Sequence, residues 1–124
     1  WEAAKADEVI FAWEDATQLV RPTIFMPDGE EKLAKRKELA EGKLADLLKA
    51  IDKVVAANPG PYCFSESLTM ADLVTYTKAD MFLSGLLDGI PASILDPCSR
   101  LLAVHKMVGE HPKVRAWNEK QAKA

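Results

Sequence analysis

The segment from Ser67 to Leu73 constrains the fold of this chain more than any other, because it predicts a helix start by two devices. The Thr69 hydroxyl can cap the helix by accepting from the Asp72 N–H, and the Asp72 carboxylate can reach back to the Thr69 N–H. This is a capping box with Asp in place of Glu. Leu68 and Leu73 occupy the positions of a hydrophobic staple on either side of the cap. We therefore expect a helix that begins directly after Thr69.

The composition is that of an ordinary globular protein, and the length of 124 residues predicts one domain over residues 1–124. The net charge of −3 disfavours nucleic acid as the main partner, because neutralising phosphates requires a basic face. No apolar run approaches the roughly 20 residues of a membrane span, and no secretory signal or presequence is recognisable. A cytoplasmic protein is expected. Because the chain starts at Trp1 inside a predicted helix, we expect it to be a segment of something longer.

The two cysteines, Cys63 and Cys98, have no CxxC or Cys/His spacing, so no metal site is predicted. They could pair, but a reduced intracellular chain is favoured, with both residues in packing or at the surface. His105 and His111 are too few for a metal cluster. The cysteine and histidine content therefore predicts no reactive centre.

Helical periodicity recurs along the chain, and no segment shows the period-2 alternation of a strand. Apolar residues at spacings of three and four predict a first helix that ends at Pro22. One long helix is expected over residues 30–57, with glutamates in its first turn, where they suit the helix dipole. The capped helix is expected to run over residues 70–87.

The last third of the chain predicts a short turn at residues 92–95 and two further helices. Asp96-Pro97 has the form of an N-cap followed by proline at the first helical position, and His111-Pro112 repeats it. The penultimate helix is expected to stop at Gly109. The three tryptophans are expected to anchor the core or an interface: Trp1, Trp13 and Trp117.

A short loop with an aromatic residue, followed by Ser-Leu-Thr-Met-Ala-Asp-Leu, resembles the capped buried helix in the C-terminal domain of cytosolic glutathione transferases. Asp7 with Glu14-Asp15 resembles the acidic pattern of that family's fourth helix. Residues 101–117 resemble the end of the domain, and Leu-Asp-Gly-Ile-Pro over residues 87–91 suits the sigma-like members of the mu, pi and sigma group. The resemblance covers essentially the whole chain in order.

The resemblance implies an all-α fold, a five-to-six-helix bundle in which the N-capped helix is central. It also implies a partner domain. In this family a thioredoxin-like N-terminal domain supplies most of the glutathione site and the side chain that engages the thiolate. No βαβ pattern exists here, so no catalytic residue is expected in this chain. It would shape the substrate pocket and part of a homodimer interface in an enzyme that conjugates glutathione, its co-substrate, to small hydrophobic electrophiles in detoxification.

The resemblance also implies four site residues at the end of the first predicted helix. Asp15 would reach across the dimer to the amine of glutathione's γ-glutamyl group; the alternative is a solvated helix acid. Thr17, Arg21 and Phe25 would line the electrophile pocket, with Phe25 as an apolar wall and Arg21 as an anion partner, although an isolated aromatic after a helix is usually core. Asp72 is assigned a structural role only.

Other functions fit the same residues. The helical domain of this family also serves as a non-catalytic interaction module in translation elongation factor and aminoacyl-tRNA synthetase assemblies, and as lens crystallin. Such a module has no need of Asp15. Some sigma-like relatives isomerise prostaglandin-type endoperoxides with glutathione as cofactor. A third alternative is an unrelated five-helix bundle with an accidental capping box.

Overall fold

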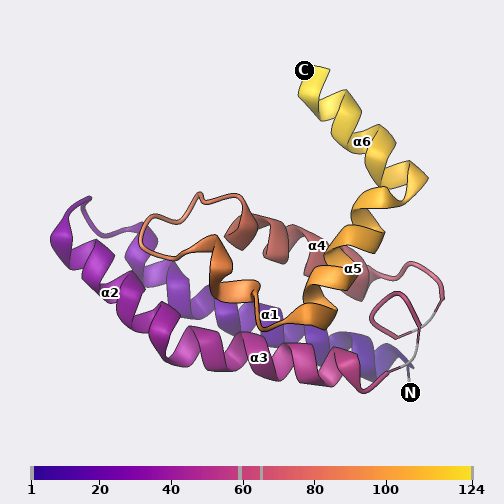
Figure 1. The fold of residues 1–124 in the computed structure, drawn as a ribbon, viewed down its shortest axis with the longest axis horizontal. Helices are drawn as coiled ribbons and strands as arrows, with labels where there is room; N and C mark the ends of the chain where they lie inside the picture. Colours follow the sequence, from indigo (N-terminus) through magenta and orange to yellow (C-terminus); the bar gives the residue numbers. More distant parts are fainter. Residues whose placement is uncertain (1, 59, 65, 124) are drawn as a thin grey trace.

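The computed structural model describes residues 2–58, 60–64 and 66–123, and in these residues it contains helices and loops but no strand (Figure 1). The elements in chain order are α1 (Glu2–Ile24), α2 (Glu30–Glu41), α3 (Lys43–Ala56), α4 (Met70–Leu83), the 3-10 helix η1 (Ala92–Leu95), α5 (Ser99–Glu110) and α6 (Pro112–Lys123). The all-α prediction is therefore confirmed. Trp1 lies outside the described residues.

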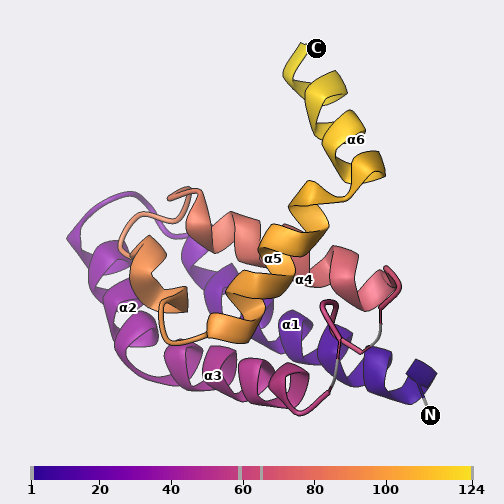
Figure 2. The ribbon, with the colours of Figure 1, turned by 45° about the vertical axis from the view of Figure 1, so that its right-hand side comes forward.

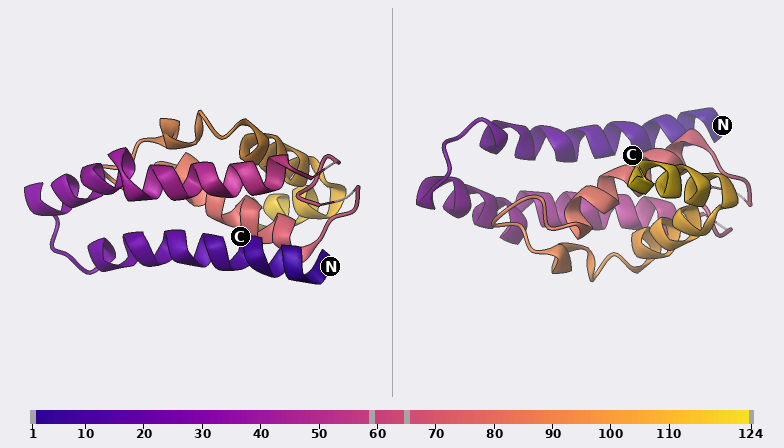
Figure 3. Two further views of the ribbon diagram at one scale, coloured as in Figure 1. Left: turned by 90° about the horizontal axis from the view of Figure 1, so that it is seen from below. Right: turned by 90° about the horizontal axis from the view of Figure 1, so that it is seen from above.

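Helix α4 packs against α1, α5 and η1, and its opposite face, with Met70, Leu73, Thr77 and Asp80, is exposed. Helix α3 lies against α1, and the two run in opposite directions, as Figure 3 shows. Helix α6 contacts α5 and projects away from the other helices in two views (Figures 1 and 2). No helix in the described part of the chain has the length and apolar character needed to cross a membrane.

Every helix contributes side chains to the core, but α6 contributes only Val114, at the edge of the core. The largest fully buried side chains are Trp13, Phe82, Leu44, Leu48, Ile51, Leu95 and Leu101. The prediction for Trp13 as a core anchor is confirmed. Trp117 is 59% exposed and is not a core residue, because α6 projects away from the other helices (Figure 2).

The predicted capping box is present at the start of α4. The Thr69 N–H donates to Asp72 Oδ2 over 2.7 Å, and the Thr69 hydroxyl donates to the same oxygen over 2.9 Å. The other carboxylate oxygen, Oδ1, accepts from the Cys63 N–H over 2.7 Å. Asp72 is fully buried. Its carboxylate therefore fixes both the helix start and the loop that precedes it. Leu68 and Leu73 line one groove beside this helix start.

The prediction that Pro22 ends the first helix is wrong, because α1 continues to Ile24. Proline removes one N–H and so one helical hydrogen bond. Pro22 lies in the last turn of α1, where few helical hydrogen bonds remain to be formed after it. The Thr23 hydroxyl donates to the Val20 carbonyl over 2.6 Å, which supplies a side-chain partner in this turn.

The single helix predicted over residues 30–57 is in fact two helices, α2 and α3, which meet at Gly42. The backbone of Gly42 (φ −131°, ψ −111°) is not helical, although its N–H and carbonyl still bond to Leu39 and Asp46. The capped helix is also shorter than predicted. It ends at Leu83 because Gly85, with φ of +75°, adopts the left-handed conformation that terminates helices.

The predicted N-cap at Asp96 is wrong, since α5 begins at Ser99 and Asp96 closes η1. Asp52 of α3 caps α5 instead. Its Oδ1 accepts from the N–H groups of Arg100 and Leu101, each over 2.9 Å. Helix α5 ends at Glu110, one residue beyond the predicted stop.

The start of α6 has the predicted form, with proline as its first residue. His111 Nδ1 accepts from the Lys113 N–H over 3.2 Å, so the ring caps the helix. The His111 carbonyl accepts from the Arg115 N–H over 2.9 Å. These two bonds account for His111, which is therefore a capping residue.

Candidate functional site

The four predicted site residues all lie on or just after α1, and the structure places them on different sides of that helix. The Asp15 side chain is exposed and makes no hydrogen bond or ion pair with the described residues. Successive residues advance by about 100° around an α-helix, so residues two positions apart point in nearly opposite directions. Asp15 and Thr17 therefore cannot face one pocket on this helix.

Thr17 and Arg21 share the other side of α1, one turn apart. The Thr17 hydroxyl is half-buried and donates to the Trp13 carbonyl over 3.0 Å. The Arg21 guanidinium is exposed, with Nη2 3.5 Å from Glu14 Oε1. An exposed pair of this kind contributes at most about 1 kcal/mol, so the guanidinium can exchange this partner for an anion at little cost.

Phe25 follows the end of α1 and is 80% exposed. The alternative that it is a core residue is therefore wrong. The ring lies in the loop between α1 and α2, beyond the last helical residue, Ile24. A single exposed apolar side chain is common on protein surfaces, so the exposure of Phe25 shows that a ligand or a neighbouring chain can reach the ring, and no more.

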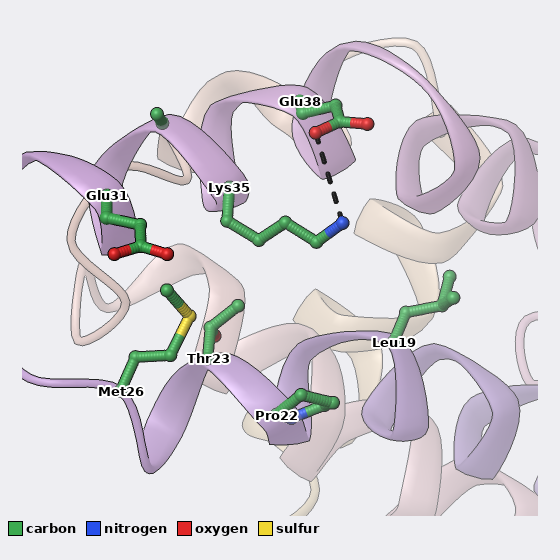
Figure 4. A pocket seen from close by; sticks show the side chains of 8 residues that line it. Leu19, Pro22, Thr23, Met26, Glu31, Lys35 and Glu38 are labelled. Atoms are coloured by element: carbon green, nitrogen blue, oxygen red, sulfur yellow. Dashed lines mark ion pairs between the residues drawn. The ribbon is translucent and has the colours of Figure 1, made fainter.

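A cavity of about 450 Å³ lies between the end of α1 and the start of α2. Figure 4 shows Leu19, Pro22, Thr23 and Met26 on one side and Glu31, Lys35 and Glu38 on the other; Ala34 of α2 also belongs to the lining. Its size is in the range of small-molecule sites. Its lining includes neither Asp15 nor any of the predicted pocket residues Thr17, Arg21 and Phe25.

Polar and apolar side chains divide this cavity between the two helices. The α1 wall is mostly apolar, with Leu19, Pro22 and the Met26 thioether, whereas the α2 wall has charged groups (Figure 4). Lys35 Nζ lies 3.9 Å from Glu38 Oε2 across this wall. The arrangement suits an apolar molecule with a polar edge, because the apolar body and the polar edge would each meet matching groups.

A buried arginine holds one residue of the cavity wall in place. Arg36 of α2 is only 4% exposed; its Nε donates to Thr23 Oγ1 over 2.9 Å, and its Nη1 donates to the Asp88 carbonyl over 3.1 Å. A buried cation is tolerated only when its donors are satisfied. The bonds tie α1, α2 and the loop after α4 together, so the position of Thr23 in the cavity wall is fixed.

The sequence reasoning missed the residues of this cavity and Arg36. Pro22 and Met26 lie next in sequence to the predicted Arg21 and Phe25, but the side of α1 that α2 covers could not be read from α1 alone. The one available signal was the arginine at position 36, which lies three residues, about one helical turn, before the buried Leu39 of α2.

The two cysteines are both buried and unpaired. Burial raises the pKa of the Cys63 thiol to about 12, aided by the nearby Asp72 charge and opposed by the hydrogen bond to Thr75. Burial likewise raises the pKa of Cys98 to about 11. Since the thiolate is the reactive form, neither cysteine is a nucleophile near neutral pH. The expectation of packing cysteines agrees with this burial.

Metal-binding groups do not converge in the described residues: no group of three or more His, Cys, Asp or Glu side chains could hold an ion there. The described residues offer three features: the exposed carboxylate of Asp15 on α1, a cavity beside it with one apolar and one charged wall, and exposed apolar side chains nearby.

A comparison with protein families decides what kind of domain this is. The model of the glutathione S-transferase C-terminal domain matches residues 14–121 of the chain. The chain belongs to this family. The comparisons with curated proteins and with solved structures returned no match.

The match to the glutathione S-transferase C-terminal domain covers all four candidate site residues and the whole lining of the α1–α2 cavity. It also covers the capping box of α4 and most of α6. The alternative of an unrelated helical bundle is therefore wrong. The family assignment and the all-helical structure agree with each other.

Proposed function

We propose that this glutathione S-transferase C-terminal domain is the helical half of a sigma-like enzyme that conjugates glutathione to small hydrophobic electrophiles. The observation that carries the proposal is the family match over residues 14–121, which includes a cavity of ligand size beside an unpaired carboxylate. A thioredoxin-like domain would bind most of the glutathione and supply the thiolate chemistry. The enzyme would be a cytoplasmic homodimer with a detoxifying role.

In this proposal Asp15 binds the amine of the γ-glutamyl group of glutathione in the partner subunit. A carboxylate suits an ammonium, and Asp15 is exposed with no competing partner among the described residues. A charge-assisted hydrogen bond of this type contributes roughly 1.5–3 kcal/mol. The exposed position on α1 is what a contact between subunits requires.

The electrophile would bind near the end of α1. The predicted residues Thr17, Arg21 and Phe25 would meet it from one side of the helix, and the cavity lined by Pro22 and Met26 offers a second position on the α2 side. These two positions are distinguishable, because Met26 lines the cavity and Thr17 does not. Alanine variants of Thr17 and Met26 would show which one raises the KM for an aromatic electrophile.

The test of the proposal uses the full chain with its N-terminal domain. We expect it to bind immobilised glutathione and to conjugate a small aromatic electrophile. Asp15→Asn should weaken glutathione binding by roughly 10- to 150-fold, the equivalent of the lost charge-assisted bond. Asp7→Asn, an exposed acid on the same helix, is the matched control and should bind as the parent does. Equal affinity of the Asp15 variant and the parent would remove Asp15 from the site.

The second candidate function is a non-catalytic interaction module in a larger assembly. The observation that favours it is the exposed Trp117 on α6, a helix that projects from the bundle (Figure 2). Tryptophan is enriched at the centres of protein interfaces. An intact two-domain chain that fails to bind glutathione would support the module over the transferase.

A further inference from the structure

The segment over residues 60–64, which precedes the capping box, is held on the bundle by side chains. Tyr62, Cys63 and Phe64 are buried, so the segment covers part of the core. Among the described residues, no backbone–backbone hydrogen bond joins it to a helix or to another loop. A buried backbone without such bonds needs side-chain partners for its N–H and C=O groups. Residues 60–64, named the strap from here on, therefore depend on the side chains that supply those partners.

The carbonyl side of the strap is bound by one guanidinium from α5. Arg100 Nη2 donates to the carbonyls of Gly60 and Tyr62, the latter over 2.6 Å. Its Nη1 donates to the Pro61 carbonyl over 3.4 Å. Hydrogen bonds from a charged donor are stronger than those between neutral groups. Because three successive carbonyls share this one cation, Arg100 carries most of the attachment on this side.

The amide side of the strap is bound by α4. The Cys63 N–H donates to Asp72 Oδ1 over 2.7 Å, and the Cys63 sulfur lies 3.6 Å from the Thr75 hydroxyl oxygen. The second carboxylate oxygen of Asp72, Oδ2, serves the capping box through the N–H and the hydroxyl of Thr69. Release of the strap would therefore free Oδ1 and leave the box in place, and with it the start of α4.

The start of α5 is also held without the strap. Asp52 of α3 accepts from the backbone N–H groups of Arg100 and Leu101, whereas the strap is bound by the Arg100 side chain. The guanidinium can release the three carbonyls without loss of this cap. Both helix starts beside the strap are thus fixed by bonds that the strap does not share. Local opening without unfolding of the bundle requires this separation.

We propose that the strap opens as a unit while the helices stay folded, that the Arg100 guanidinium is its latch, and that opening brings Cys63 into contact with solvent. The strap then controls when this thiol reacts. In the closed state burial raises the pKa of the Cys63 thiol to about 12, so the reactive thiolate is absent near neutral pH. In the open state the thiol meets oxidants and electrophiles directly. The device operates whether or not the full protein is a transferase.

The experiment follows alkylation of Cys63 and Cys98 by iodoacetamide in the full chain without denaturant, with each cysteine read separately by peptide mass spectrometry. Only an open state reacts, so the rate reports how often that state is populated. The free energy of global unfolding, from chemical denaturation, sets the rate that unfolding alone permits. We expect Cys63 in the parent to react about tenfold or more above that limit, with a weaker dependence on low urea than global unfolding has.

Arg100→Lys tests the latch, because lysine keeps the charge but lacks the planar fork that reaches several carbonyls. It should raise the Cys63 rate about tenfold or more, the equivalent of one lost charge-assisted bond, and leave the Cys98 rate unchanged. Hydrogen exchange should become faster at the Cys63 amide and stay the same at the Thr69 amide, whose acceptor remains in the box. Arg115→Lys, at an exposed arginine outside the strap, is the matched control.

Three results would overturn the proposal. A parent Cys63 rate at the global limit would mean that the strap opens only with the bundle. An unchanged Cys63 rate in Arg100→Lys would remove the latch. Acceleration of Cys63 and Cys98 by the same factor in that variant would mean that Arg100 stabilises the whole fold and not the strap. The first measurement needs no variant, so it decides the question for a chain in which Arg100→Lys fails to fold.

Discussion

The indole N–H of Trp13 donates a hydrogen bond to the Thr75 hydroxyl over 3.1 Å, between two side chains that are both fully buried. The same hydroxyl oxygen lies 3.6 Å from the Cys63 thiol. Asp72 accepts from the backbone of Cys63 and of Thr69, so one connected set of buried polar groups joins α1, the loop before α4 and α4 itself. Buried polar groups are stabilising only when every member is satisfied, which makes this set sensitive to single changes.

Thr75→Val should destabilise the chain by about 1–3 kcal/mol. The two side chains have nearly the same shape, so the main effect is an indole N–H left without its acceptor in the core. Chemical denaturation followed by tryptophan fluorescence measures the loss in the free energy of unfolding. Thr77→Val is the matched control, because Thr77 is exposed and bonds only to a carbonyl of its own helix. Equal stability of the Thr75 and Thr77 variants would contradict the argument.

Asp72→Ala should cost more, about 3 kcal/mol or above. It removes the cap of α4 and also leaves the N–H groups of Cys63 and Thr69 without acceptors. Asp72→Asn keeps one acceptor oxygen and should have an intermediate effect. Urea midpoints for the two variants and for Asp7→Ala, an exposed acid, measure the difference. A loss below about 1 kcal/mol for Asp72→Ala would show that the box is dispensable.

Asp52→Ala should loosen the start of α5. The Asp52 carboxylate caps two N–H groups of that helix, and a cap of this kind contributes roughly 0.5–2 kcal/mol. Hydrogen exchange at the amides of Arg100 and Leu101 should become faster, because these donors lose their acceptor. Asp46→Ala is the control, since Asp46 is exposed in the first turn of α3, the helix that carries Asp52. Unchanged exchange at both amides would show that the helix start is held by other contacts.

The parts of the fold that could be predicted are those set by neighbours in sequence. Thr69 and Asp72 are three residues apart, and the start of α6 at Pro112 depends on His111 beside it. The cap of α5 could not be found in this way, because Asp52 and Arg100 are 48 residues apart and meet only in the folded chain. A local pattern at Asp96-Pro97 predicted the wrong cap for this reason.

Helix ends were less predictable than helices, and two glycines show why. Gly42 divides a segment whose apolar stripe continues across it, so the pattern gave no sign of the break. Gly85 ends α4 by its positive φ, but Leu87 beyond it is buried and extended the apolar pattern past the true end. In both cases the burial pattern persists while the backbone changes direction.

The candidate site was predictable only in part. The sequence places Asp15, Thr17 and Arg21 on the first helix and Phe25 after it, and the structure has the same order, but Asp15 faces away from Thr17. The cavity beside them depends on how α2 crosses the end of α1 and on the Arg36–Thr23 bond, which joins residues 13 apart. Tertiary packing of this kind has no local signature.

The two buried thiols predict a loss of stability at high pH. Folding raises the pKa of Cys63 from its ordinary 9.0 to about 12 and that of Cys98 from 9.0 to about 11. The folded state therefore favours the protonated thiol. This contribution is complete below pH 9, and it is lost as the pH rises towards the folded values, since the unfolded chain ionises first.

Between about pH 9 and 11, each thiol should lower the free energy of unfolding by roughly 1.4 kcal/mol per pH unit. The Cys63→Ala/Cys98→Ala double variant isolates the contribution of the two thiols from that of the other ionisable groups. Its stability should fall less steeply with pH than that of the parent, although at neutral pH it is less stable because of two small cavities. Parallel pH profiles for parent and variant would show that the thiols ionise as readily in the folded chain as in the unfolded one.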